Sequence, residues 1–87
     1  LRVEPRAEQA VQGEPDRVLI GRVLEAMSET LRVPLVMRDM DELSYQEIAD
    51  ELEIRLSAVK MRIKRGREEF RRLYDLATAG ADLAADA

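Results

Sequence analysis

The sequence of 87 residues contains no cysteine, no histidine and no tryptophan. Without cysteine it can form neither a disulfide framework nor a thiolate metal site. Without histidine it lacks the most common zinc ligand and the usual general base at neutral pH. Aromatic residues make up only 3% of the chain, which argues against a stacking platform for single-stranded nucleic acid. We therefore expect no enzyme activity, no metal and no cofactor.

Long apolar runs are also missing, and no signal-peptide pattern opens the chain. We expect a cytoplasmic protein with no membrane contact of its own. The length suits one small domain, and the absence of an initiator methionine indicates a fragment of a longer protein. The acidic residues lack the fixed spacing and turn glycine of a calcium loop, so they give no reason to expect a metal site.

The charges are divided unevenly along the chain. The formal net charge is −4, yet residues 55–72 contain eight basic and two acidic residues, a local charge of +6 that leaves −10 on the rest. A partner meets a surface and not an average, so this segment is a candidate site for an acidic partner. The alternative interpretation is a solvated helix face with scattered charge.

Apolar spacings of three and four residues predict an all-α fold of about four helices. Residues 1–15 have the proline and glycine content of a linker, residues 16–76 form the domain, and residues 77–87 form an alanine-rich tail. We expect helix caps at Asp16 and Ser28. Pro34 predicts a kink or a break, because proline removes a backbone donor within a helix.

A capped short helix, a tight turn and a second capped helix then follow one another. Ser44 and Glu47 form a capping-box pattern before a helix over residues 45–52. We expect a turn over residues 53–56 and an N-cap at Ser57. Ala49 is small where the two helices would cross, and Ile54 and Val59 would close the corner. This arrangement is typical of a helix-turn-helix unit, in which the second helix enters the major groove of DNA.

The basic residues lie in the second helix and not in the first, which favours DNA binding over an ordinary helical hairpin. Four residues are predicted to contact bases from the outward face of this helix: Lys60, Met61, Lys64 and Arg65. Six are predicted to contact phosphates: Ser44, Tyr45, Ser57, Ala58, Arg62 and Arg67. For Arg62 an ion pair with Glu47 or Glu51 is an equal alternative, and for Ser44 capping alone is the favoured role. For Arg32 and Arg38 we expect ion pairs with nearby acidic residues.

Three blocks of this sequence resemble region 4 of extracytoplasmic-function (ECF) sigma factors, the promoter-specificity subunits of bacterial RNA polymerase. The blocks are residues 31–40, residues 43–49 and residues 58–67. The resemblance implies a winged-helix-like sigma region 4 that recognises the −35 promoter element while docked on the flap of the polymerase β subunit. It also implies that residues 1–15 are the end of the linker from a preceding sigma domain, and that an anti-sigma factor is a partner. For Arg32 and Arg38 it implies contacts with a protein partner, whereas we favour the ion pairs expected above.

Several residues depart from the family pattern. Ser28 stands where proline is usual, Ala58 where threonine is usual, and Gly66 where alanine is usual. Glu42 and Glu53 stand where glycine is usual in the two turns, so each must adopt a positive φ or use another turn. An alternative function is therefore a sigma-like domain that binds an anti-sigma factor without binding DNA. A helix-turn-helix regulator unrelated to polymerase is a further alternative, disfavoured by the block at residues 31–40.

Overall fold

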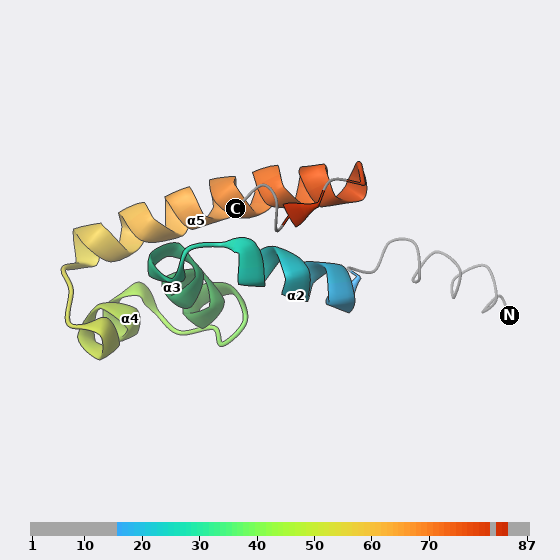
Figure 1. Cartoon of the computed structure of the whole chain (residues 1–87). Helices are drawn as coiled ribbons and strands as arrows, with labels where there is room; N and C mark the ends of the chain where they lie inside the picture. Colours follow the sequence, from blue (N-terminus) through green and yellow to red (C-terminus); the bar gives the residue numbers. More distant parts are fainter. Residues whose placement is uncertain (1–15, 81, 84–87) are drawn as a thin grey trace, which may run out of the picture.

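The computed structural model describes residues 16–80 and 82–83, and this part of the chain consists of four helices without a strand (Figure 1). In chain order the helices are α2 (Arg17–Ala26), α3 (Glu29–Asp39), α4 (Tyr45–Leu52) and α5 (Leu56–Thr78). The predicted all-α class is thereby confirmed. Since the described residues contain no β-hairpin, the likeness to a winged helix is limited to its helices. The predicted linker at residues 1–15 lies outside the described residues.

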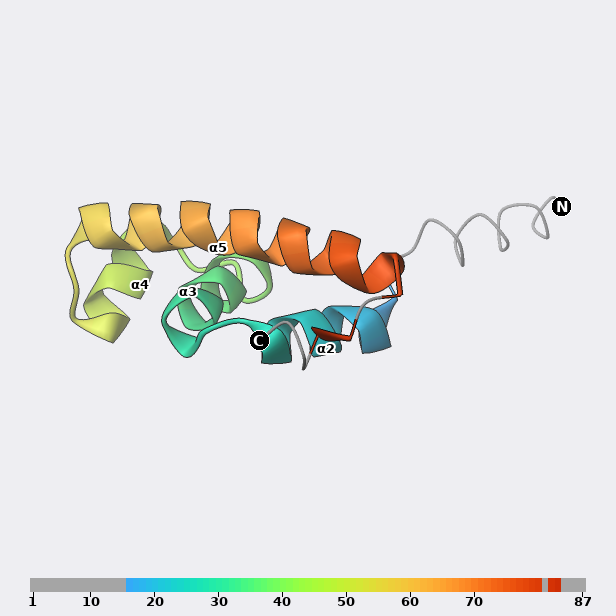
Figure 2. The same ribbon diagram turned by 45° about the horizontal axis from the view of Figure 1, so that its top comes forward.

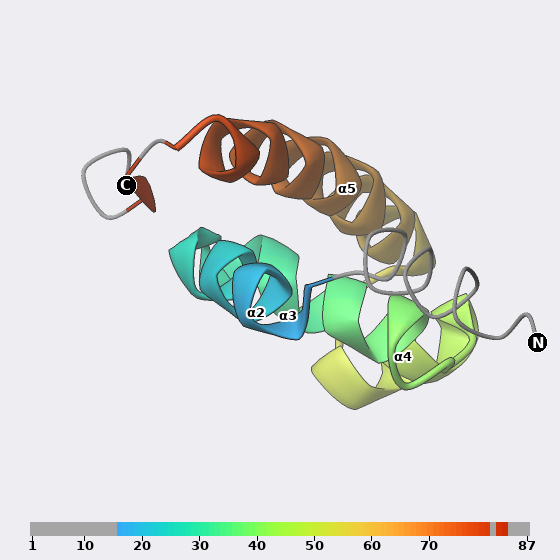
Figure 3. The ribbon, with the colours of Figure 1, turned by 90° about the vertical axis from the view of Figure 1, so that its right-hand side faces the viewer.

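The longest helix, α5, packs against each of the other three. Figures 1 and 2 show α4 beside its N-terminal end and α2 beside its C-terminal part, with α3 between them. Seen from the side, α2 and α3 lie together on one flank of α5 (Figure 3). Because α5 connects the whole arrangement, its outward face is held in place along nearly all of its length.

The boundary between the first two helices lies at Met27 and Ser28. Asp16 caps α2 as predicted, since its carboxylate accepts bonds from the N–H groups of Val18 and Leu19. Ser28 is the N-cap residue of α3, although its side chain makes no capping hydrogen bond. The chain does not break at Pro34, which lies buried within the continuous α3. Of the two alternatives predicted for Pro34, the break is therefore wrong. The helices are separated by the extended backbone at Met27 and Ser28, where Ser28 was predicted as an N-cap.

The helix-turn-helix unit forms from α4 and α5. The capping box of α4 is present in full, because the Ser44 hydroxyl accepts from the Glu47 N–H and the Glu47 carboxylate accepts from the Ser44 N–H. The prediction that Ser57 caps the second helix is wrong. The N-cap residue is Arg55, two residues earlier, so α5 begins at Leu56, and Arg55 makes no side-chain capping bond.

Glutamates occupy the left-handed position in two turns, the one between α3 and α4 and the one between α4 and α5. Glu42 has a φ of 60° and Glu53 a φ of 57°, a region that glycine enters more easily than glutamate. After Glu53 the N–H of Ile54 donates to the carbonyl oxygen of Ala49 at 3.1 Å, as in a Schellman motif. Both turns thus adopt the left-handed geometry with a glutamate, and not a glycine, at this position.

One hydrophobic core joins all four helices. Ile48 and Val59 are fully buried, and Ala49 and Ile63 are nearly so, which confirms the predicted contact between α4 and α5. Leu52 and Ile54 are partly buried against this core. Residue 49 is therefore a small alanine at a closely packed position, where a larger side chain would have to displace its neighbours.

The C-terminal end of α5 turns back toward the core. Gly80 adopts a φ of 90°, and its N–H donates to the carbonyl oxygen of Ala77 at 3.0 Å. Beyond this turn Leu83 belongs to the buried core and is 8% exposed. The sequence interpretation assigned no role to residues 77–87. The structure shows that this segment supplies one core side chain, while residues 81 and 84–87 lie outside the described part.

Candidate nucleic-acid interface

The N-terminal half of α5 presents a basic outward face. Its buried side, which includes Val59 and Ile63, packs on the core, so the opposite side of the helix faces solvent. The four residues predicted to contact bases all lie exposed: Lys60, Met61, Lys64 and Arg65. Met61 is 49% exposed, so it does not pack in the core. The structure brings this set together on one accessible surface.

Most of these basic side chains are not neutralised within the protein. Among the described residues, neither Lys60 nor Arg65 forms an ion pair, and both are exposed. Lys64 lies 3.7 Å from a Glu68 carboxylate oxygen, with both side chains well exposed. A solvent-exposed pair of this kind is worth little and is easily exchanged for another partner. The basic charge on this half of the helix remains available to a polyanion.

The first turn of α5 adds backbone donors to the same surface. The first N–H with a helical partner belongs to Val59, which donates to the carbonyl oxygen of Arg55. The N–H groups of residues 56–58 lie in the first turn and so have no helical partner, and Arg55 supplies no side-chain cap in its place. Such groups, at the positive end of the helix dipole, suit a phosphate oxygen. Ser57 and Ala58, predicted as phosphate contacts, lie in this turn. The half-buried Arg62 lies one turn further on and forms no ion pair with the described residues.

Two other predicted phosphate contacts are already engaged. The Ser44 hydroxyl is used in the capping box, and the Glu47 carboxylate stands beside it. The Tyr45 ring is half-buried, and the guanidinium carbon of Arg38 lies 5.0 Å from its centroid. These contacts weigh against a role in DNA binding for either residue.

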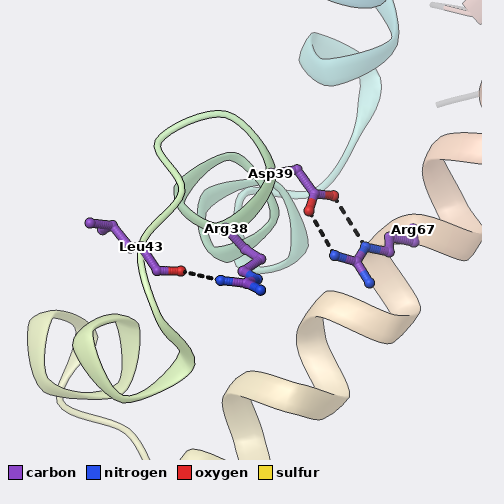
Figure 4. A network of polar contacts seen from close by, with 4 residues as sticks. All are labelled: Arg38, Asp39, Leu43 and Arg67. Carbon is purple, nitrogen blue, oxygen red and sulfur yellow. Dashed lines mark hydrogen bonds and ion pairs between the residues drawn. The ribbon is translucent and has the colours of Figure 1, made fainter.

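Arg67 is likewise held within the protein. Its Nη2 and Nε groups donate to the two carboxylate oxygens of Asp39, at 2.7 and 3.1 Å (Figure 4). These hydrogen bonds raise the pKa of Arg67 above its usual value, and the negative charge of Asp39 and the nearby Tyr45 act in the same direction. Arg67 is therefore fully charged at any physiological pH. The contacts weigh against the prediction that Arg67 binds phosphate.

The expectation of ion pairs for Arg32 and Arg38 is wrong. Arg38 donates to the carbonyl oxygen of Leu43 at 2.9 Å, and Arg32 donates to that of Leu24 at 3.4 Å. Both arginines lie half-buried between helices, where backbone carbonyls are the nearer acceptors. The sequence could not show this, because it does not show which acceptor each guanidinium group reaches in the folded chain.

Gly66 marks a close approach between α3 and α5 that the sequence analysis did not identify. A Cβ atom at this position would lie 3.1 Å from the carbonyl oxygen of Leu31 and 3.5 Å from the Cβ of Leu35. The glycine thus lets the two helices pack closely, in addition to weakening α5 locally. Its only signal in the sequence is its place on the buried stripe, seven residues after Val59 and three after Ile63.

Neither a metal site nor a membrane span finds support in the described residues. They contain no group of three or more acidic side chains arranged to hold a metal ion. No helix in residues 16–80 is both long enough and apolar enough to cross a bilayer.

Comparison with known proteins agrees with this arrangement. The family model described as Sigma-70, region 4 matches residues 17–70, which include the whole of α2, α3 and α4 and most of α5. The ECF RNA polymerase sigma-E factors of Escherichia coli (strain K12) and Salmonella typhi are each 36% identical to this chain over 61 residues. The aligned part is 70% of this chain but only 32% of each relative. No solved structure matches the chain. The resemblance found from three sequence blocks is confirmed, and the chain belongs to the sigma-70 region 4 family, as a domain of the ECF type.

Proposed function

We propose that this domain recognises the −35 element of bacterial promoters and so helps to direct RNA polymerase to its start sites. The family supports a role in DNA recognition. The observation that carries the proposal is the outward face of α5, where Lys60, Lys64 and Arg65 lie exposed beside Met61. Lysine and arginine suit the acceptors of guanine in the major groove, and a methionine side chain suits the thymine methyl group.

The phosphate contacts proposed from this geometry lie on α5 alone. They are the free N–H groups of Ser57 and Ala58 and the side chain of Arg62. A helix inserted by its N-terminal half places such groups along the edge of the groove. In the complete transcription machinery we expect region 4 to dock on the flap of the polymerase β subunit and to be controlled by an anti-sigma factor.

The test starts from a duplex selected by this domain from a random pool, with a scrambled duplex as the reference. Because phosphate neutralisation releases counterions, the three phosphate contacts proposed above predict a slope of log K against log salt of about −3. Lys64→Ala should weaken binding to the selected duplex by about 1 kcal/mol more than to the scrambled duplex, the low end for a base contact.

The matched control is Arg71→Ala, which removes a basic residue two turns further along the same helix. We expect it to affect both duplexes equally. Binding that does not change with salt, or a pool from which no sequence is enriched, would contradict the proposal. In that case the basic face of α5 would be better explained as a site for an acidic protein, and the interpretation of a domain that binds only an anti-sigma factor would replace it.

A further inference from the structure

The C-terminal end of α3 holds both helices of the helix-turn-helix unit. Two adjacent residues there, Arg38 and Asp39, point to different partners (Figure 4). Arg38 bonds to the segment that leads into α4, and Asp39 bonds to the middle of α5. A single turn of α3 is thus connected to each of the two helices whose relative orientation defines the unit.

The contact with α4 involves both the backbone and a ring. The Nη1 group of Arg38 donates to the carbonyl oxygen of Leu43 at 2.9 Å, immediately before the capping box of α4. The guanidinium group also lies over the ring of Tyr45, the first residue of that helix, at 5.0 Å from the centroid. The two contacts together fix where α4 begins relative to the end of α3.

The contact with α5 has the geometry of a specific pair. The guanidinium fork of Arg67 meets both oxygens of Asp39, at 2.7 and 3.1 Å, across 28 residues of sequence. Two parallel bonds define an orientation as well as a distance, which a single contact does not. The other ion pairs described on α5, such as Arg71 with Asp75, join residues three or four apart on the helix itself. Those pairs cannot orient α5 relative to another element.

We propose that Arg38, Asp39 and Arg67 are positioning residues, which set the angle of α5 and thereby determine how well its N-terminal half discriminates between DNA sequences. The proposal rests on the function proposed above. Contacts to base edges need side chains placed to within a fraction of an ångström, so a small rotation of α5 affects discrimination before it affects general attraction. In this role Arg67 acts through Asp39, and not on a phosphate.

The direction in which one substitution changes the affinity for DNA separates this role from simple electrostatics. Asp39 is a negative charge next to a basic helix, so its removal should favour DNA if charge alone matters. If Arg67 were a phosphate contact restrained by Asp39, Asp39→Asn would release it and strengthen binding further. The positioning role predicts the opposite result, namely that Asp39→Asn weakens binding to the selected duplex.

The experiment measures the Kd of Asp39→Asn, Arg67→Gln and the double variant for the selected and scrambled duplexes at several salt concentrations. Each single variant should lose about two- to fivefold affinity for the selected duplex, in keeping with the worth of an exposed but bidentate pair. Binding to the scrambled duplex should change little. The double variant should be no weaker than either single variant, because both remove the same interaction.

Two further variants guard against an effect of stability alone. Arg67→Lys keeps the charge but loses the fork, so we expect an unchanged salt slope and reduced discrimination. The matched control is Asp75→Asn, which removes the acid of a pair within α5 and should leave discrimination unchanged. All measurements are made at a temperature where thermal melts show each variant to be folded.

The outcomes distinguish the two proposals. Stronger binding by Asp39→Asn, together with weaker binding and a salt slope reduced by about 1 for Arg67→Gln, would identify Arg67 as a phosphate contact and overturn the positioning role. Unchanged discrimination in Asp39→Asn would also overturn it, while leaving the function proposed for α5 intact. If the unsubstituted domain itself fails to discriminate between the duplexes, the proposed function fails, and the positioning role falls with it.

Discussion

The two halves of α5 form one continuous helix but differ in charge. Residues 56–65 contain four basic residues and no acidic one, whereas residues 66–78 contain three of each. In the second half Arg67 pairs with Asp39, Arg71 with Asp75 and Arg72 with Glu69. The local charge of +6 that the sequence gives to residues 55–72 therefore overstates the length of the basic surface. The surface available to a polyanion is the first half.

The halves also pack on different neighbours. Figures 1 and 2 show α4 beside the start of α5 and α2 beside its later part. The first half thus completes the helix-turn-helix unit, whereas the second half connects that unit to the rest of the core. This division assigns recognition to the first half and support to the second, and the following substitutions test it.

The largest effect is expected when the charge of one basic residue is reversed in each half. Lys60→Glu should weaken duplex binding by about thirty- to hundredfold, because a like charge placed against phosphates costs several kcal/mol. Arg71→Glu changes the net charge equally but lies about 16 Å further along the axis. That distance is twice the Debye length of about 8 Å at physiological salt, so we expect a loss of roughly threefold at most. Titration of one duplex with each variant measures the two losses of affinity. Equal losses would contradict the assignment of recognition to the first half of α5 and support to the second.

A second substitution acts on the packing beneath the first half. Ala49 is 4% exposed where α4 meets α5. Ala49→Leu should lower the free energy of unfolding by about 1–3 kcal/mol, because overpacking forces neighbours off their preferred geometry. Ala79→Leu is the control, since Ala79 is exposed beyond the end of α5. Thermal or denaturant unfolding measures both. A variant at residue 49 as stable as the control would mean that the two helices are not closely packed there.

Patterns that repeat along one element could be predicted from the sequence. The capping box at Ser44, the bounds of α4 and the buried face shared by Ile48 and Val59 all follow from spacing and side-chain chemistry within a few residues. The outward placement of Lys60 and Met61 follows from the same periodicity. The exposed part of the candidate site was predictable for this reason.

Contacts between distant segments could not be predicted in this way. Arg67 is one of several similar arginines in the sequence, and only the fold shows that Asp39 lies opposite it. Arg38 similarly finds a backbone carbonyl and not a carboxylate. The core position of Leu83 depends on the reversal at Gly80, which the composition of the tail does not reveal. In each case the deciding quantity is a distance between elements, which no local pattern contains.

Two helical glycines differ in the space around them, one within α2 and one at the junction between the two halves of α5. Gly21 lies within α2, and a Cβ added there would meet nothing within 4 Å, so Gly21→Ala should stabilise the domain by about 1 kcal/mol through helix propensity. Gly66→Ala gains the same propensity but places its Cβ 3.1 Å from the carbonyl oxygen of Leu31. We expect its net gain to be smaller, because α3 and α5 must move apart slightly. Denaturant unfolding of both variants measures the difference, and equal gains would show that Gly66 does not set the separation of the helices.

The smallest effect is expected at Glu53, the left-handed residue in the turn before the basic half of α5. A non-glycine residue in this conformation costs about 1–2 kcal/mol. Glycine relieves that strain but makes the unfolded chain more flexible, which offsets about 0.4–1 kcal/mol. Glu53→Gly should therefore raise the stability only by a few tenths to about 1 kcal/mol. Glu42→Gly is the matched control for strain, since its φ of 60° is nearly the same, and its gain should be similar.

Glu53→Asn tests the charge separately, because asparagine tolerates the left-handed region while removing the carboxylate. Both substitutions at residue 53 should strengthen duplex binding slightly, since they remove a negative charge next to the first turn of α5. Unfolding curves and duplex titrations at low salt measure the two effects. Weaker DNA binding by both Glu53 variants would mean that the turn, and not its charge, limits how the first half of α5 meets DNA.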